Sequence, residues 1–128
     1  MKHLILILLT ALCCTCCNAQ KDKEATTMKT TERFDVQYYK KIIKEKNTYE
    51  SATSAQYVER NGTETYVSFN EDGFVLQEIK PFTYEMIVKN YYKNCILKSK
   101  GKLLCHSSVK IGIWREYDNQ GNLIKETD

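Results

Sequence analysis

Few residues beyond the first twenty could take part in nucleophilic or metal chemistry. Cys105 and His106 are neighbours in the chain, and His106 is the only histidine after His3. Adjacent residues of a strand point to opposite faces of a sheet, so this pair cannot easily form a thiolate–imidazole couple. One histidine also leaves a zinc site short of ligands and most catalytic triads without a base. The sequence therefore predicts no catalytic residues, no metal, no cofactor and no small-molecule substrate.

Cys95 and Cys105 leave two alternatives open. An oxidising compartment would permit a disulfide between them, worth roughly 2–3 kcal/mol of stability. In a hairpin that turns at Asn94-Cys95, however, Cys105 falls at the far end of the returning strand, beyond the reach of a disulfide. We therefore expect two free thiols.

The chain of 128 residues begins with a segment unlike the rest. Lys2 and His3 precede a run from Leu4 to Leu12 that is almost entirely apolar, and the sequence becomes sharply polar at Gln20. The run is shorter than the ~20 residues of a membrane-spanning helix. This order of regions predicts a secretory signal peptide over residues 1–19.

Two ways of processing this signal stay open. Small residues precede Gln20 at the −3 and −1 positions, as an ordinary signal peptidase requires. Alternatively, residues 1–16 are removed and Cys17 becomes a lipidated first residue. The sequence Cys-Asn-Ala-Gln from Cys17 resembles the start of many small lipoproteins of the Bacteroidetes group, although cysteines replace the usual lipobox residues before it. Lipid chains on Cys17 would attach the protein to a bilayer.

The remaining sequence divides into a tether and one domain. Residues 20–31 are polar and without apolar periodicity, which predicts a flexible tether. Beyond Asn47 the chain is rich in Tyr, Val, Ile, Thr and Phe with regular turn signals. Residues 32–128 are therefore expected to form a single α+β domain, in which an N-terminal amphipathic helix precedes an antiparallel β-meander.

The helix is expected between Glu32 and Lys46. Phe34, Tyr38 and Ile42 recur at a spacing of four, with Val36, Tyr39 and Ile43 alongside, which predicts one amphipathic helix. Asp35 is a suitable N-cap.

The turns of the meander are marked by glycine and asparagine. Asn61-Gly62 predicts a two-residue hairpin in which both residues take positive φ. Gly73 and Gly121 are expected to close slightly longer turns in the left-handed conformation. Another turn is expected at Asn94-Cys95.

A repeat is visible within the meander. Within a unit near residues 66–79, residues 66–78 align without a gap with residues 114–126, and a third unit over residues 91–101 fits the same frame. A lone hairpin cannot bury one face, but consecutive hairpins that share an edge can. The expected aromatic anchors are Tyr66, Phe69, Tyr91, Tyr92, Trp114 and Tyr117, and the expected turn positions are Asn61, Gly62, Gly73, Cys95 and Gly121.

The sequence from Tyr91 to Glu126 resembles the MORN-repeat-variant pattern. That pattern reads Tyr-x-Asn-Gly-x-Leu-Lys-x-x-Gly, followed by Gly-x-Trp-x-x-Tyr-Asp-x-x-Gly-x-Leu, and here Cys95 replaces the turn glycine. A longer, less polar connection over residues 103–108 is a second departure. Bacterial proteins of this type are often labelled antitoxin-like, and the resemblance implies hairpin repeats and protein partners.

Positive charge is concentrated in one segment. Residues 80–110 hold seven lysines and one glutamate, whereas residues 20–79 and 111–128 each carry a net charge of −2. The expected basic patch consists of Lys93, Lys98, Lys100 and Lys102, and it could contact anionic lipid or an acidic protein. The alternative is that these are solvated lysines that protect strand edges from aggregation.

The sequence as a whole predicts a non-enzymatic exported protein of the cell envelope, either periplasmic or an outer-membrane lipoprotein, with surface exposure open. We expect it to bind an unidentified protein partner through its hairpin repeats, and not nucleic acid. Two alternatives stay open: an immunity or antitoxin-type protein that neutralises a toxin, and a lipid-binding module at a membrane surface.

Overall fold

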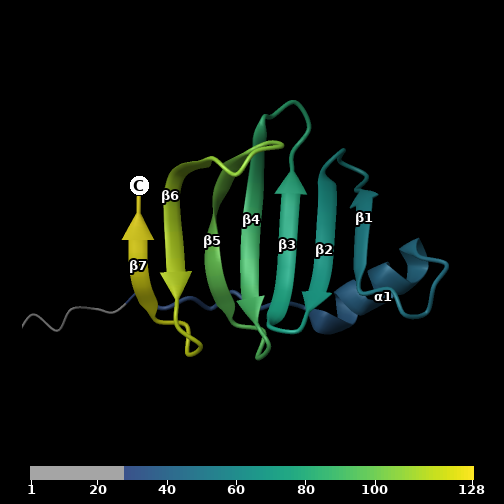
Figure 1. Ribbon diagram of the computed structural model, residues 1–128, viewed down its shortest axis with the longest axis horizontal. Helices are drawn as coiled ribbons and strands as arrows, with labels where there is room; N and C mark the ends of the chain where they lie inside the picture. The colour runs from purple at the N-terminus through teal and green to yellow at the C-terminus, as the bar shows by residue number, and fades with distance from the viewer. Residues whose placement is uncertain (1–27) are drawn as a thin grey trace, which may run out of the picture.

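The computed structural model describes residues 28–128, so the signal, Cys17 and the first part of the tether lie outside the described residues. One helix precedes a single seven-stranded sheet in which strand order follows chain order and every neighbouring pair is antiparallel (Figure 1). The expectation of a helix followed by an antiparallel meander is confirmed. The elements are α1 (Val36–Lys46), β1 (Ser54–Val58), β2 (Glu64–Asn70), β3 (Gly73–Ile79), β4 (Glu85–Tyr92), β5 (Leu97–Leu104), β6 (Lys110–Tyr117) and β7 (Leu123–Thr127).

Helix α1 begins where its N-cap residue allows. The Asp35 carboxylate accepts a hydrogen bond of 2.9 Å from the Tyr38 backbone N–H, as expected of this residue. Phe34, immediately before the cap, stacks on Tyr39 with ring centroids 4.8 Å apart. This contact between the residues on either side of the cap is a hydrophobic staple, and it fixes the direction in which the chain enters the helix.

Only part of the expected apolar pattern of the helix faces the core. Ile43 is buried and Val36 and Tyr39 pack against the core, whereas Tyr38 is 52% exposed. Phe34 lies before the helix rather than in it. Its apolar side chain nevertheless fitted the spacing of four, because a staple residue is buried on the same side as the helix.

Residues 28–34, here called the N-terminal strap, run along one end of the sheet (Figure 1). The Met28 carbonyl accepts a hydrogen bond of 2.8 Å from the Leu123 N–H, and the Thr30 N–H donates one of 2.8 Å to the Gly121 carbonyl. Further along, the Phe34 N–H donates to the Cys95 carbonyl at 2.9 Å. Residues 28–31 are therefore docked on the sheet, and assigning them to a flexible tether was wrong.

The sheet has a covered face and an open face. Alternation along the strands places Val67, Leu76 and Leu97 on the covered face, where they meet Phe34 and Ile43 in one buried cluster. Phe34 lies parallel to the Phe74 ring at 4.5 Å between centroids. The strap and α1 thus supply the second layer that an apolar sheet face requires.

The turn at Asn61-Gly62 was predicted incorrectly. The Glu59 N–H donates to the Thr63 carbonyl and the Gly62 N–H to the Glu59 carbonyl, both at 2.9 Å. Only Gly62 takes a positive φ, of 85°. The loop therefore contains three residues with glycine in the left-handed position, which is another common hairpin form.

The three turns at the strapped end of the sheet are of two kinds. Gly121 (φ 89°) and Cys95 (φ 69°) occupy the same position, since the N–H of each donates to the carbonyl three residues earlier. The longer turn with a left-handed glycine is confirmed at Gly121. At Gly73 it was wrong: the turn is two residues long and Gly73 is the first residue of β3, opposite Asn70. A Cβ atom on Gly73 would collide with the Tyr91 carbonyl, so close backbone approach explains this glycine.

Candidate interaction surfaces

The six expected aromatic anchors divide evenly between the two faces of the sheet. Phe69, Tyr91 and Tyr117 each stand one residue before the pair that closes a turn, and all three contact the core on the covered face. This common position agrees with the frame of the predicted repeat, while its assignment to a repeat family stays a prediction. The other three, Tyr66, Tyr92 and Trp114, lie on the open face.

Trp114 fills a gap in the sheet rather than forming an exposed contact. Its indole ring lies over Gly101 of the neighbouring strand so closely that a Cβ atom on that glycine would overlap the ring. The indole N–H donates to the Lys102 carbonyl at 2.9 Å, and the Lys110 ammonium stands 4.5 Å from the ring centroid. Trp114 is 8% exposed, so its main role is to cover the glycine.

A hollow of about 450 Å³ lies beside Trp114 on the open face. Tyr92 lines it, with the Lys98 ammonium 5.5 Å from the centre of its ring and its own hydroxyl donating to the Tyr117 carbonyl at 2.8 Å. Ile124 adds apolar surface to the lining, and Glu116 adds a charged group. Such a mixed surface can accept an apolar side chain and satisfy polar groups around it.

The expected basic patch is not one surface. Lys98 lies over Tyr92 on the open face, whereas Lys100 lies on the covered face, 3.2 Å from the Glu32 carboxylate. Lys102 pairs with Glu85 at 2.7 Å, and Lys93 is exposed in the turn. The local charge count was correct, but a shift of register at the start of β5 and ion pairs to other segments distribute the charge.

Glu32 of the strap is the centre of a polar cluster that the sequence did not reveal. Its carboxylate lies 2.7 Å from the Lys89 ammonium and accepts a hydrogen bond of 3.1 Å from the Tyr91 hydroxyl. Burial opposes ionisation of Glu32, but hydrogen bonds from Lys89 and Lys100 outweigh it and hold the pKa of Glu32 below its usual value. Burial, together with the Glu32 charge, raises the pKa of Tyr91. The cluster fastens the strap to β4 and β5.

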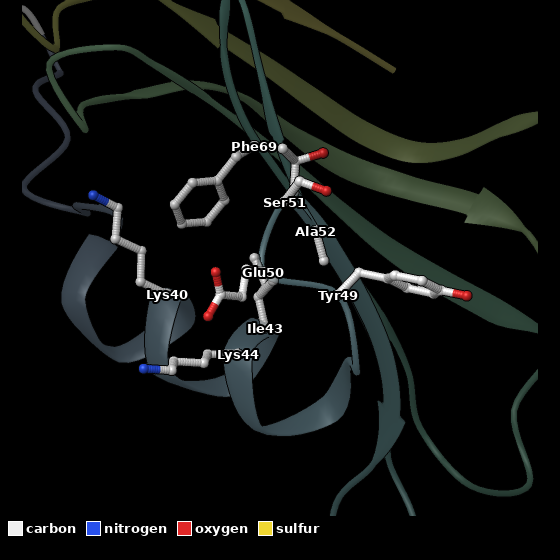
Figure 2. Close-up of a pocket in the computed structure, with 9 residues that line it drawn as sticks. Lys40, Ile43, Lys44, Tyr49, Glu50, Ser51, Ala52 and Phe69 are labelled. Atoms are coloured by element: carbon white, nitrogen blue, oxygen red, sulfur yellow. The ribbon is translucent and has the colours of Figure 1, made fainter.

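A second hollow, of about 520 Å³, lies between α1 and the loop that leads to β1 (Figure 2). Ile43, Ala52 and Phe69 contribute apolar surface, Lys40 and Lys44 extend from the helix, and Glu50 lies between them. None of these three charged residues forms an ion pair with another described residue. The apolar lining lets this hollow accept an apolar side chain, and the mixed charge around it favours neither an anion nor a cation.

The thiols and the histidine do not form a reactive site. Cys95 and Cys105 are both free, as expected, because they lie in turns at opposite ends of β5. Within residues 28–128, no three side chains of the His, Cys, Asp or Glu type are grouped as metal ligands would be. The single described helix is too short and too polar to cross a bilayer.

Comparison with protein-family models, curated proteins and solved structures gave no match for this chain. The resemblance to the MORN-repeat variant therefore stays a prediction from the residues that carry it.

Proposed function

We propose that the protein is a non-enzymatic binding module of the cell envelope whose partner is another protein. The observation that best supports this proposal is that, among the described residues, the seven-stranded sheet has a second layer on one face only (Figure 1). In the described part of the chain, no helix or strand packs on the open face. A sheet that exposes apolar side chains on one face commonly buries them against a further layer, which here would come from a partner.

The composition of the open face supports a protein partner. Tyr66, Val75, Met86 and Tyr92 are half-buried by their neighbours and present apolar and aromatic surface. Gln77 and Asn90 lie between them on the same face and supply polar groups. Aromatic residues and methionine among neutral polar side chains are typical of the centre of a protein interface.

The proposal can be tested by photo-crosslinking in cells of the native host. The crosslinker p-benzoylphenylalanine is placed at Gln77 on the open face and, in a matched variant, at Gln37 on the exposed side of α1. We expect a discrete adduct with one protein from position 77 and none from position 37. A repeat experiment at Tyr66 should yield the same adduct, since Tyr66 lies opposite Gln77 in the sheet.

The absence of an adduct at both positions 77 and 66, in variants whose circular dichroism matches the wild type, would contradict a role for the open face. An adduct of equal yield at position 37 would contradict it as well. Identification of the crosslinked protein as a toxin would favour the immunity alternative.

A further inference from the structure

The end of the sheet opposite the strap carries a group of exposed apolar side chains on two loops. The loop of residues 80–84 joins β3 to β4, and the loop of residues 105–109 joins β5 to β6 (Figure 1). Phe82 is fully exposed, Tyr84 is 82% exposed and Val109 is 55% exposed. These two loops are here called the loop end. Its exposed aromatic rings are unusual because aromatic side chains of this size are normally buried.

Hydrogen bonds hold the two loops in one arrangement. The Cys105 N–H donates to the Tyr84 carbonyl at 2.8 Å and so joins the loops to each other. Within the first loop, the Thr83 hydroxyl donates to the Lys80 carbonyl at 2.9 Å. The rings of Phe82 and Tyr84 are therefore presented by an ordered backbone.

Phe82 also has a backbone conformation that is sterically unfavourable for a residue with a bulky side chain. Its φ is 62°, in the left-handed region that bulky residues rarely occupy. Such a conformation is energetically unfavourable and clusters at functional sites. A glycine would avoid this cost, so the phenylalanine ring is the feature that needs explanation.

One unpaired lysine lies beside these rings. Lys80 precedes Phe82 in the same loop and forms no ion pair with another described residue. Lys102 is neutralised by Glu85 at 2.7 Å, and the Lys110 ammonium lies over the Trp114 ring on the open face. Exposed aromatic rings beside a lysine match the interface of an anionic bilayer, where rings enter the headgroup region and ammonium groups contact phosphate.

The shape of the loop end favours a bilayer over a folded protein. None of the hollows described above includes Phe82, Tyr84 or Val109, which project outward. A projecting ring can enter lipid without a shaped partner, whereas burial in a protein requires a complementary pocket on that protein. We propose that the loop end inserts Phe82 and Tyr84 into the interface of an anionic membrane, with Lys80 at the lipid phosphates. This contact goes beyond the proposed protein binding and leaves the open face free.

The proposal is tested on the full chain with a tryptophan reporter at the loop end. The variant Phe82→Trp is mixed with vesicles of phosphatidylglycerol and phosphatidylcholine in equal parts, brominated in their acyl chains. Tyr49→Trp is the matched control, because Tyr49 is a 77% exposed aromatic residue in the loop between α1 and β1, near the strapped end. Both variants keep Trp114 and the same N-terminal segment, so the wild-type emission is subtracted and any binding by that segment is shared.

We expect the bromolipids to quench the added emission of Phe82→Trp and not that of Tyr49→Trp. Adding Lys80→Gln should lower the ratio of inserted to free loop end roughly fivefold, since a lysine near an anionic surface contributes about 1 kcal/mol. Quenching of Phe82→Trp no greater than that of Tyr49→Trp overturns the proposal and points to a protein partner at this end. Equal quenching with phosphatidylcholine alone overturns the assignment of Lys80 to the lipid phosphates.

Discussion

At one end of the sheet Phe69, Tyr91 and Tyr117 pack beneath the strap and α1, whereas at the other end Phe82 and Tyr84 extend into solvent. Both ends consist of hairpin turns, and both contain non-glycine residues with positive φ, Cys95 at one and Phe82 and His106 at the other. The difference arises from what covers them. The strap contributes backbone hydrogen bonds and the Phe34 ring to the first end, and no described segment does this at the second.

Similar local geometry therefore serves two purposes at the two ends of the sheet. At the strapped end the aromatic residues form the hydrophobic core and their loss should lower stability. At the loop end they make little contact with the rest of the protein, so their loss should alter binding and leave stability nearly unchanged. Measurements of stability and of binding on matched variants can test this separation.

The two phenylalanines provide the strongest contrast. Phe34→Ala removes a buried ring that stacks on both Tyr39 and Phe74, so the free energy of unfolding should fall by about 3–5 kcal/mol. Phe82→Ala removes a fully exposed ring and should change it by less than about 0.5 kcal/mol. Urea denaturation followed by far-ultraviolet circular dichroism measures both. Similar losses for the two variants would refute the division between core and display.

Two glycines with positive φ differ in what an added Cβ atom would meet. Gly73→Ala should cost about 2–4 kcal/mol, because its φ is 150° and its Cβ atom would also meet the Tyr91 carbonyl, which is fixed in the sheet. Gly112→Ala in β6 should cost only about 1–2 kcal/mol, because its φ is 60° and no atom lies within 4 Å of the added carbon. Thermal unfolding of the two variants gives the order. If Gly112→Ala is the more destabilising, the contact with the Tyr91 carbonyl adds nothing to the strain of the backbone.

Cys95 and Phe82, two turn residues with positive φ, should respond alike in stability and differently in binding. Cys95→Gly and Phe82→Gly each relieve a positive φ, and each should raise the free energy of unfolding by about 0.5–1 kcal/mol after the entropy of the added glycine is counted. Only Phe82→Gly should reduce association of the loop end with lipid. Unfolding curves and vesicle flotation, compared with the wild type, separate the two effects. A loss of stability in Phe82→Gly would show that its ring makes native contacts.

The ion pairs of Glu32 should make the strap sensitive to acid. The folded-state pKa of Glu32 is lowered, so its contribution is fully present above the unfolded-state pKa and is lost as the pH falls through the folded value. The difference in stability between the wild type and Glu32→Gln should therefore shrink between about pH 6 and about pH 3. Urea midpoints at both pH values measure this small effect. A difference that stays constant would mean that Glu32 acts through packing alone.

Local patterns in the sequence sufficed for the meander, the cap at Asp35, the turn at Gly121 and the separation of the two thiols. Each depends on neighbouring residues or on distance along one strand. The start of α1 was placed too early because Phe34 shares the spacing of the helix without belonging to it. The turn at Gly73 was misjudged because its glycine is required by Tyr91 of the next hairpin, eighteen positions away and invisible to local turn rules.

The strap and the surfaces could not be predicted, because their partners are distant in the sequence. Residues 28–31 are polar and resemble a linker, and only their hydrogen bonds to Gly121 and Leu123 make them part of the sheet's edge. The lysines of residues 93–102 were grouped by charge, whereas a shift of register between β4 and the start of β5 sends Lys98 and Lys100 to different faces. The exposure of Phe82 had no signal, since an apolar residue beside a proline is compatible with a buried or an exposed turn.

The strap also determines the order in which the molecule can assemble. Every strand pairs with its neighbour in the chain, so the sheet can grow hairpin by hairpin through contacts of low sequence separation, which favours rapid folding. Glu32, in contrast, contacts Tyr91 and Lys100 across 59 and 68 residues. The strap leaves the ribosome before every strand, yet its docking sites on β4, β5 and β7 are complete only when the last hairpin has formed. The strap is therefore synthesised before every strand but makes its full set of contacts last, and we expect its docking to complete the fold.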